Sequence, residues 1–293
     1  MEEAEAPAAR ELGEAETLWA RLRETPYPPE KLWARGPVPD VTATKVIAFV
    51  GSRNATAYGL EAARHLVEGL RGYPVTVASG LALGIDAAAL AAAIDANLPT
   101  IALPGSGLSD EALYPRTNLP LARKILRRGG CLLSEMAPPD RAAPWSFPRR
   151  NRILAGVADA VIVVEAQPRS GTLITARLAL DYSREILSVP GSIFSTRSAG
   201  ANWLLSQGAA PARSAEDILR AVGIEPREEV SPSPPPPDLE PDARALFAAI
   251  EHPMSRDSLA DELGWDAARL AVAAATLELH GLAEESLGSL RRR

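Results

Sequence analysis

One pattern recurs five times between residues 45 and 191, and it restricts the chain to few folds. A short apolar run rich in β-branched residues is followed by a turn of small residues, and then by an Ala- and Leu-rich stretch of helical character. The apolar runs are Lys45–Val50, Val75–Ala78, Thr100–Leu103, Val161–Val164 and Ile186–Val189. Strands that are apolar throughout are usually covered on both faces. The pattern therefore predicts an α/β fold in which helices wrap both faces of a parallel sheet.

The turns after these strands predict where a ligand would bind. Right-handed crossovers place all of them along the carboxyl edge of the sheet. Glycine there lets a ligand approach the backbone, and the following helix offers free N–H groups and the positive end of its dipole. Phosphate is the ligand that such an edge favours. The turns that carry this expectation are Gly51-Ser52-Arg53, Ser79-Gly80, Gly105-Ser106-Gly107, Ser170-Gly171-Thr172 and Pro190-Gly191.

The remainder of the chain divides by composition. Residues 1–40 combine an acidic helical stretch, Glu11 to Arg23, with a proline-broken segment, and are predicted to be an N-terminal extension. Residues 41–222 form the α/β domain, and 223–240 are a Pro-rich linker with a stiff run from Ser231 to Pro237.

Residues 241–293 are predicted to form a small winged-helix-like domain. Three helices are expected, at 241–250, 256–263 and 266–280, followed by a short tail. The last two have helix-turn-helix spacing, with Gly264 in the turn and Asp266 as a candidate N-cap.

Charge and composition exclude several classes of protein. The formal net charge of −6 argues against a surface coated in positive charge, so any nucleic-acid site must be local. Arginine supplies all but three of the 31 basic residues, which suits bidentate phosphate contacts. The acidic start lacks a leader pattern and no run of 18 apolar residues occurs, so we expect neither export nor a membrane partner. The single cysteine, Cys131, is expected to be a buried thiol in a protein of the cytoplasm.

The common catalytic and cofactor motifs are absent from the sequence. The histidines, His65, His252 and His280, lie far apart and lack metal-ligand spacing. No nucleophile elbow, Walker A loop or dinucleotide fingerprint follows a strand. Asp86 could act as a general base, but a carboxylate at a helix start is the more economical interpretation. We therefore expect no metal, no cofactor and no enzymatic activity.

The segment Trp145-Ser146-Phe147-Pro148-Arg149-Arg150-Asn151-Arg152 supports two interpretations. Aromatic rings that stack on unpaired bases, beside arginines that neutralise phosphates, hold single-stranded nucleic acid without sequence preference. Alternatively, Phe147 packs in the core and the arginines pair with carboxylates such as Asp159 and Glu165. The octapeptide alone leaves both open.

Two further groups at the sheet edge have a double interpretation. Arg53 follows the first strand, where the loop would direct it at a bound phosphate, although an exposed arginine can simply be solvated. Ser170 to Thr172 and Thr175 are either helix caps alone or caps that also offer hydroxyls and amides to a phosphate.

A series of short motifs, in one order, resembles the DNA-processing protein A (DprA/Smf) family over about residues 26–220. The motifs are Gly51-Ser52-Arg53, Ser79-Gly80-Leu81-Ala82-Leu83-Gly84-Ile85-Asp86, Tyr114-Pro115, Ser134-Glu135, Phe147-Pro148-x-Arg150-Asn151-Arg152, Val164-Glu165, Ser170 to Ala176 and Pro190-Gly191. The C-terminal region also resembles the winged-helix-like domain that many members carry.

This resemblance implies an extended Rossmann-like domain that forms a homodimer and binds single-stranded DNA. It also implies a mediator that protects incoming DNA and helps to load RecA recombinase during natural transformation. Arg53, Phe147, Arg150 and Arg152 would line the pocket, Arg149 and Asn151 lie in the same motif, and Gly51, Ser52, Ser79, Gly80 and Ser170 to Thr172 would shape the floor. A dimer surface is implied near Trp203, Leu204 and Leu205.

The chain departs from the family pattern at three places. Leu90 stands where the family usually has a histidine, the N-terminal helical domain is missing or reduced to residues 1–25, and lysines around the pocket are scarce. Arginines must therefore supply the charge.

Two alternatives belong to other classes. One is a nucleotide-processing enzyme similar to the cytokinin-activating phosphoribohydrolases, although the stretch Gln167 to Thr175 lacks their tandem glycines and closing glutamate. The other is duplex reading by the winged-helix domain. Its last helix carries one arginine, Arg269, which favours a protein partner, while Arg291 to Arg293 could touch a DNA backbone.

Overall fold

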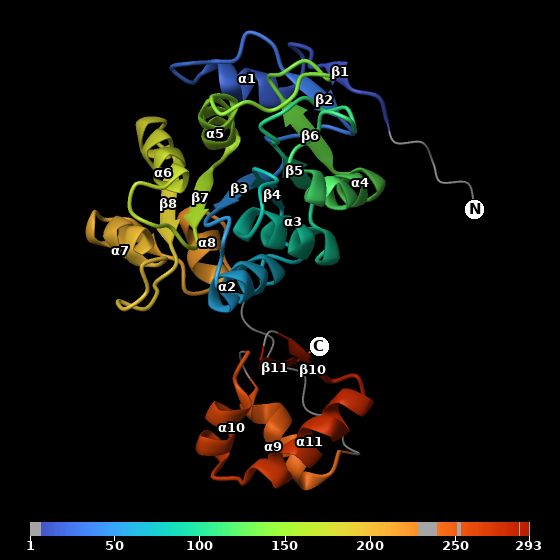
Figure 1. Cartoon of the computed structure of the whole chain (residues 1–293), viewed down its shortest axis with the longest axis vertical. Helices are drawn as coiled ribbons and strands as arrows, with labels where there is room; N and C mark the ends of the chain where they lie inside the picture. Colours follow the sequence, from blue (N-terminus) through green and yellow to red (C-terminus); the bar gives the residue numbers. More distant parts are fainter. Residues whose placement is uncertain (1–6, 228–238, 251–252, 287, 293) are drawn as a thin grey trace, which may run out of the picture. The chain divides into compact units, whose positions relative to one another are not determined.

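The computed structural model describes residues 7–227, 239–250, 253–286 and 288–292. The predicted polyproline run Ser231 to Pro237, His252 and Arg293 lie outside these residues. The chain separates into two compact units, residues 1–226 and residues 227–293 (Figure 1). No helix in the described part of the chain is both long enough and apolar enough to cross a membrane.

The first unit is built on a nine-stranded sheet in the order β1-β2-β6-β5-β4-β3-β7-β8-β9. The strands are β1 (Arg10–Glu11), β2 (Trp33–Arg35), β3 (Lys45–Val50), β4 (Val75–Ser79), β5 (Thr100–Ala102), β6 (Cys131–Ser134), β7 (Ala160–Val163), β8 (Glu185–Ser188) and β9 (Ala210–Pro211). All pairs from β6 to β9 are parallel, and β1 and β2 add an antiparallel edge. The α/β sheet predicted from the sequence is confirmed.

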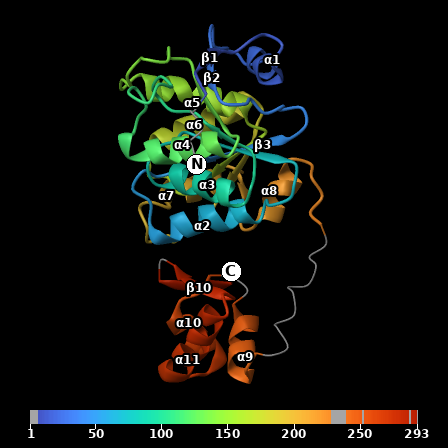
Figure 2. The same ribbon diagram turned by 90° about the vertical axis from the view of Figure 1, so that its right-hand side faces the viewer.

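Helices cover both faces of this sheet (Figures 1 and 2). They are α1 (Thr17–Arg23), α2 (Ala57–Glu68), α3 (Ile85–Asp95), α4 (Leu119–Arg127), α5 (Ser146–Val157), α6 (Gly171–Asp181), α7 (Ala199–Ser206) and α8 (Ala215–Ala221), with a 3-10 turn at Arg116–Asn118. Along β3, Val46, Ala48 and Val50 pack in one core with residues of α1, α5, α6 and α7. Ile47 and Phe49 pack in the opposite core with α2, α3 and α8. Successive side chains of a strand point to opposite faces of the sheet, so β3 contributes to two separate cores.

The strand order reverses beside β3. The chain proceeds from β3 through β4 and β5 to β6 on one side, and then returns to place β7, β8 and β9 on the other. In open α/β sheets, ligands bind at such a switch point, outside the carboxyl ends of the strands. The loops after β3 and β7 therefore border the place where this topology favours a ligand.

The N-terminal segment, predicted to be an extension, packs into the core of the first unit. Leu18 and Leu22 of α1, together with Leu32 and Ala34, are fully buried in the core. The predicted helix from Glu11 is shorter, because Glu11 pairs with Trp33 in the sheet and α1 begins only at Thr17.

The second unit contains α9 (Pro241–Ala249), α10 (Arg256–Leu263) and α11 (Ala267–Leu279), followed by an antiparallel hairpin of β10 (Ala283–Ser286) and β11 (Ser289–Arg292). Gly264 ends α10 at a φ of +65°, which glycine adopts without strain. The side chain of Asp266 caps α11 by accepting from the amide of Arg269 at 2.7 Å. The predicted winged helix is confirmed, and what the sequence indicated as a short tail is its hairpin wing.

Candidate nucleic-acid interface

A cavity of about 750 Å³ opens at the carboxyl edge of the sheet, beside the switch point, and we call it the main cavity. Its walls come from the loop after β3, the start of α5 and the start of α6. Nine predicted site residues line it: Gly51, Ser52, Arg53, Phe147, Arg150, Asn151, Ser170, Gly171 and Thr172. Segments more than 100 residues apart in sequence therefore meet in one place.

The first turn of α5 is fixed to the sheet by Ser146. This buried hydroxyl bonds to the carbonyl oxygen of Gly105, after β5, at 2.5 Å. The ring of Phe147 then lies against Gly105, where an added Cβ would come within 2.5 Å of the ring. Tyr114 packs its ring edge on Phe147, with centroids 5.8 Å apart. Glycine at 105 is thus required by the place of this aromatic ring.

Arg53 is the exposed cation of the main cavity. Its guanidinium stacks over the ring of Phe147, 5.0 Å from the centroid. No carboxylate in the described part of the chain lies within ion-pair distance of it. An arginine held by a ring and left without a carboxylate keeps its hydrogen-bond donors available to an anion.

Arg150 forms the inner wall of the main cavity. Its Nη1 donates to the carbonyl oxygens of Gly80, at 2.5 Å, and Leu103, and its Nε donates to Asn151 Oδ1 at 3.1 Å. Burial lowers the pKa of Arg150 to about 10, against the opposing effect of Asp86, so the guanidinium is charged at neutral pH.

Asp86 faces Arg150 and is buried. Burial raises the pKa of this carboxyl, against the lowering effects of Arg150, of the Ala82 amide and of Ser79. The amide of Ala82 donates to Asp86 Oδ2 at 3.3 Å. The predicted role of Asp86 as a helix-start carboxylate is therefore combined with a second one, the electrostatic support of Arg150.

The N-terminus of α6 forms the opposite wall. Ser170 occupies the N-cap position, but its side chain makes no capping bond, and its Oγ is buried without a hydrogen-bond partner among the described residues. A Cβ added at Gly171 would meet nothing within 4 Å. Thr172 Oγ1 donates to the carbonyl of Gly51 at 3.2 Å and so ties α6 to the loop after β3. This wall leaves open space beside a positive helix end.

Several predicted site residues do not reach the main cavity. Arg149 and Arg152 leave the other side of α5 and both pair with Glu135, while Arg152 also donates to the Tyr27 carbonyl. Arg149 and Arg152 therefore pair with a carboxylate, as the second interpretation expected. Their partner is Glu135, and not Asp159 or Glu165. Asp159 instead pairs with Arg21.

Other predicted site residues stabilise the fold next to the main cavity. Ser79 is buried and donates to the carbonyl of Phe49 at 2.6 Å, and Gly80 accepts from Arg150. Gly51 must be a glycine because a Cβ there would come within 2.5 Å of Ile85. Leu90, at the position of the family's histidine, is fully buried among apolar residues.

The predicted dimer surface is only partly at the surface. Trp203 of α7 is half exposed, but Leu204 is buried in the core. Leu204 therefore cannot contribute to an interface without repacking, which corrects the prediction for this residue.

Sequence reasoning missed some of the residues that line the main cavity. Asn54 and Gln167 lie in the loops after β3 and β7, and Pro144 precedes α5. The position of Asn54 and Gln167 just beyond predicted strands was the sequence feature that could have identified them as cavity residues. No group of three or more metal-ligating side chains occurs within the described ranges.

Residues 14–223 match the family model described as DNA recombination-mediator protein A. The chain belongs to this family. Residues 230–288 also match the model of the DprA winged helix domain. The resemblance stated from the sequence motifs is thus confirmed.

Curated members of the family share up to about two fifths of the aligned residues. The chain is 40% identical over 195 residues to the DNA processing protein DprA of Bacillus subtilis, covering 67% of this chain and 65% of that protein. It is 43% identical over 173 residues to protein Smf of Escherichia coli, covering 59% of this chain and 46% of that protein. The matched region thus spans about half to two thirds of these relatives.

Solved structures of family members have the same fold. DNA processing protein A of Streptococcus pneumoniae superposes with a TM-score of 0.67 at 33% identity, covering 74% of this chain and 75% of that one. The Helicobacter pylori protein, whose structure concerns its single-stranded DNA binding mode, gives a TM-score of 0.64 at 26% identity, covering 74% and 96%.

Proposed function

We propose that this member of the recombination-mediator family binds single-stranded DNA in the main cavity. The observation that carries the proposal is the pairing of Arg53 with Phe147 at the switch point, opposite an open helix N-terminus. Exposed arginine and an aromatic ring are the two components of a site that holds single strands without reading sequence. The single-stranded DNA binding of the Helicobacter pylori relative supports the same assignment.

Each wall of the cavity has a role in this proposal. Arg53 contacts a phosphate and Phe147 stacks on a base, while Arg150 adds positive charge from within. The amides and hydroxyls at the start of α6, from Ser170 to Thr172, receive a second phosphate. Asn151 lies between these walls, with its Nδ2 3.5 Å from the carbonyl of Gly171.

The affinity for single-stranded DNA should fall with salt. If the cavity neutralises two or three phosphates, counterion release predicts about a 7- to 20-fold loss between roughly 50 and 200 mM salt. A titration of a fluorescent oligo-dT, followed by anisotropy at several salt concentrations, measures this slope. An affinity that does not change over this range would contradict a phosphate-based site.

Replacing Gly171 with alanine should weaken DNA binding without harming the fold. Apart from its chain neighbours and the backbone of its own helix, the methyl group meets nothing within 4 Å. Alanine in place of glycine in a helix changes stability by no more than about 1 kcal/mol, in the favourable direction. The same methyl stands where a phosphate would approach the amides of α6, and we expect an affinity at least about fivefold lower, roughly 1 kcal/mol.

Gly13→Ala is the matched control for Gly171→Ala. Gly13 also has open space around its Cα, and it does not line the main cavity. Equal affinities of the two variants would show that DNA does not approach the start of α6. Stability is measured for both by thermal unfolding.

We further propose that the protein acts in the cytoplasm as a homodimer that delivers single-stranded DNA to a RecA-type recombinase, by binding and not by catalysis. The family description supports mediation, and the half-exposed Trp203 on α7 suits a subunit contact. The buried acids near the sheet edge already have partners, because Asp86 faces Arg150 and Glu165 accepts from Thr56 at 2.5 and 3.0 Å. Because both carboxylates already have partners, they give no support to the alternative of a phosphoribohydrolase.

The winged-helix unit is proposed to contact a protein partner. Arg269, the arginine of α11, pairs with Asp242 at 2.7 Å and stacks over Trp265, so it is engaged within the unit. Val272 and Leu279 of the same helix are strongly exposed. A helix with an exposed apolar face and a single arginine suits a protein surface better than a DNA groove.

A further inference from the structure

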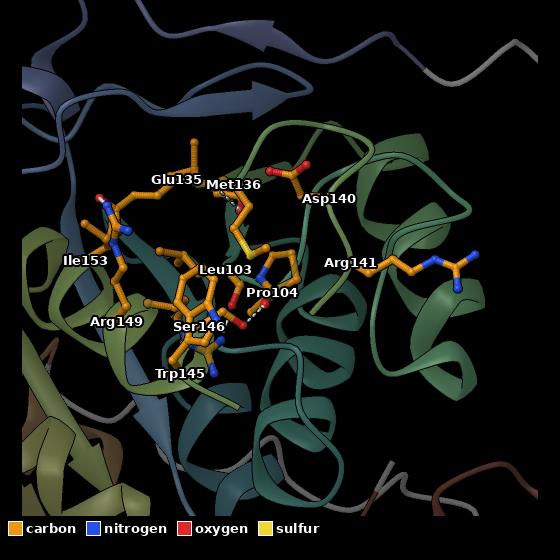
Figure 3. A pocket seen from close by; sticks show the side chains of 14 residues that line it. Leu103, Pro104, Glu135, Met136, Asp140, Arg141, Trp145, Ser146, Arg149 and Ile153 are labelled. Carbon is orange, nitrogen blue, oxygen red and sulfur yellow. Dashed lines mark hydrogen bonds and ion pairs between the residues drawn. The ribbon is translucent and has the colours of Figure 1, made fainter. Parts of the chain in front are cut away.

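A second cavity, of about 380 Å³, opens on the other side of the first turn of α5, and we call it the side cavity. Leu103, Leu133, Met136 and Ile153 give it an apolar lining, and Trp145 lies at its edge. Figure 3 shows Trp145 and Ser146 close to Leu103 and Pro104, with Glu135 and Met136 farther along the cavity. Trp145 does not line the main cavity.

The two cavities share a wall, because Arg150 lines both of them. The aromatic residues before and after Ser146 line different cavities. Phe147 lines the main cavity and Trp145 the side cavity. A strand that leaves the main cavity across the start of α5 therefore meets the side cavity next.

The side cavity combines a stacking surface with positive charge. Trp145 is 58% exposed, which leaves a large aromatic residue in contact with water. Arg149 borders the same cavity with its side chain 52% exposed, and Glu135, which it pairs with, is nearly buried. The carboxylate thus holds the guanidinium at the rim. Arg141 points away from the other lining residues (Figure 3).

We propose that the side cavity takes one unpaired base of the strand bound in the main cavity, stacked on Trp145, with its phosphate against Arg149. This inference rests on the proposed function and names a second subsite of the same interface. The apolar lining suits the face of a base, and the exposed arginine suits its phosphate. A base in a duplex would have to unpair and unstack before it could enter, which costs energy that a single strand does not spend.

The test compares Trp145→Ala and Trp145→Phe in the full chain. Stacking on an aromatic residue contributes about 1–3 kcal/mol per base, so Trp145→Ala should bind oligo-dT at least about fivefold more weakly. Trp145→Phe keeps a stacking face and should stay within about twofold of the wild type. Tyr27 is 69% exposed and lines neither cavity, so the control variant Tyr27→Ala should bind as the wild type does.

A second measurement locates the base directly. Oligo-dT carrying 5-iodouracil is crosslinked by light to the wild-type protein, and the modified peptide is identified by mass spectrometry. We expect crosslinks at Trp145 as well as at Phe147. The crosslink does not depend on how well a variant folds.

The outcomes separate this inference from the proposed function. If Arg53→Ala weakens binding but Trp145→Ala does not, and no crosslink forms at Trp145, the main cavity stands and the side cavity is not a subsite. If the wild type does not bind oligo-dT at all, the proposed function fails and this inference fails with it. Loss of affinity in Trp145→Ala with rescue by Trp145→Phe supports the subsite.

Discussion

An Arg150→Met variant is expected to lose both stability and DNA binding, the largest combined effect of any single substitution in the interface. Methionine keeps much of the side-chain volume but removes the charge that faces buried Asp86 and the donors to Gly80 and Leu103. Leaving a buried charge without its partner costs about 3 kcal/mol or more. For a unit of this size that corresponds to a fall of roughly 6–12 °C in Tm.

The stability loss of this variant should depend on pH in a defined direction. Burial already raises the pKa of Asp86, and removing Arg150 takes away an influence that lowers it. A carboxyl whose pKa is higher in the folded chain than in the unfolded chain destabilises the fold as pH rises through that window. Thermal unfolding should therefore show a smaller difference from the wild type at about pH 5 than at about pH 8.

A second substitution separates the two effects of Arg150. Asp86→Asn in the Arg150→Met background removes the stranded charge and should recover much of the lost Tm. The double variant regains the local net charge of the wild type but not the hydrogen-bond donors of the guanidinium, so affinity for oligo-dT should recover only in part. Full recovery of binding together with stability would mean that Arg150 makes no direct contact with DNA.

Phe147→Ala is expected to cause the largest loss of affinity among substitutions that leave the charge unchanged. The ring supplies a stacking face, worth about 1–3 kcal/mol or roughly 5- to 150-fold in Kd, and it also holds the guanidinium of Arg53 at 5.0 Å. Phe147→Leu is the matched variant, because it refills most of the space beside Gly105 without a π face. We expect leucine to restore Tm but not affinity in anisotropy titrations.

The support that Phe147 gives to Arg53 can be measured by a double-mutant cycle. If the ring positions the guanidinium, Arg53→Ala should cost less affinity in the Phe147→Ala background than in the wild type. Strict additivity would show that the two side chains act on DNA separately.

Much of the main cavity could be predicted because parallel topology determines where loops go. Once the five strands were identified, the turns at Arg53 and at Ser170 to Thr172 had to meet at one edge of the sheet. The octapeptide was harder, because its residues divide between two sides of a helix. Phe147, Arg150 and Asn151 share one side, whereas Arg149 and Arg152 leave from the other toward Glu135. That division follows only when the start of α5 is known.

The elements that sequence reasoning missed are short or lie at edges. β6 has four residues and no glycine–serine turn after it, and β1 and β9 have two residues each. Such strands are defined by their neighbours in the sheet and leave no periodic pattern of their own. Leu204 was placed at a surface by the family resemblance alone, which does not show which side of α7 faces the core.

The most direct test of the central claim is a comparison of oligo-dT with a matched duplex by fluorescence anisotropy, for the wild type, Arg53→Ala and Arg71→Ala. Arg71 is an exposed arginine just before β4, at the amino edge of the sheet, and serves as the matched control. We expect the wild type and Arg71→Ala to prefer the single strand, and Arg53→Ala to bind it at least about tenfold more weakly, roughly 1.4 kcal/mol. Equal affinity of the wild type for the duplex, or no effect of Arg53→Ala, would contradict single-strand binding in the main cavity.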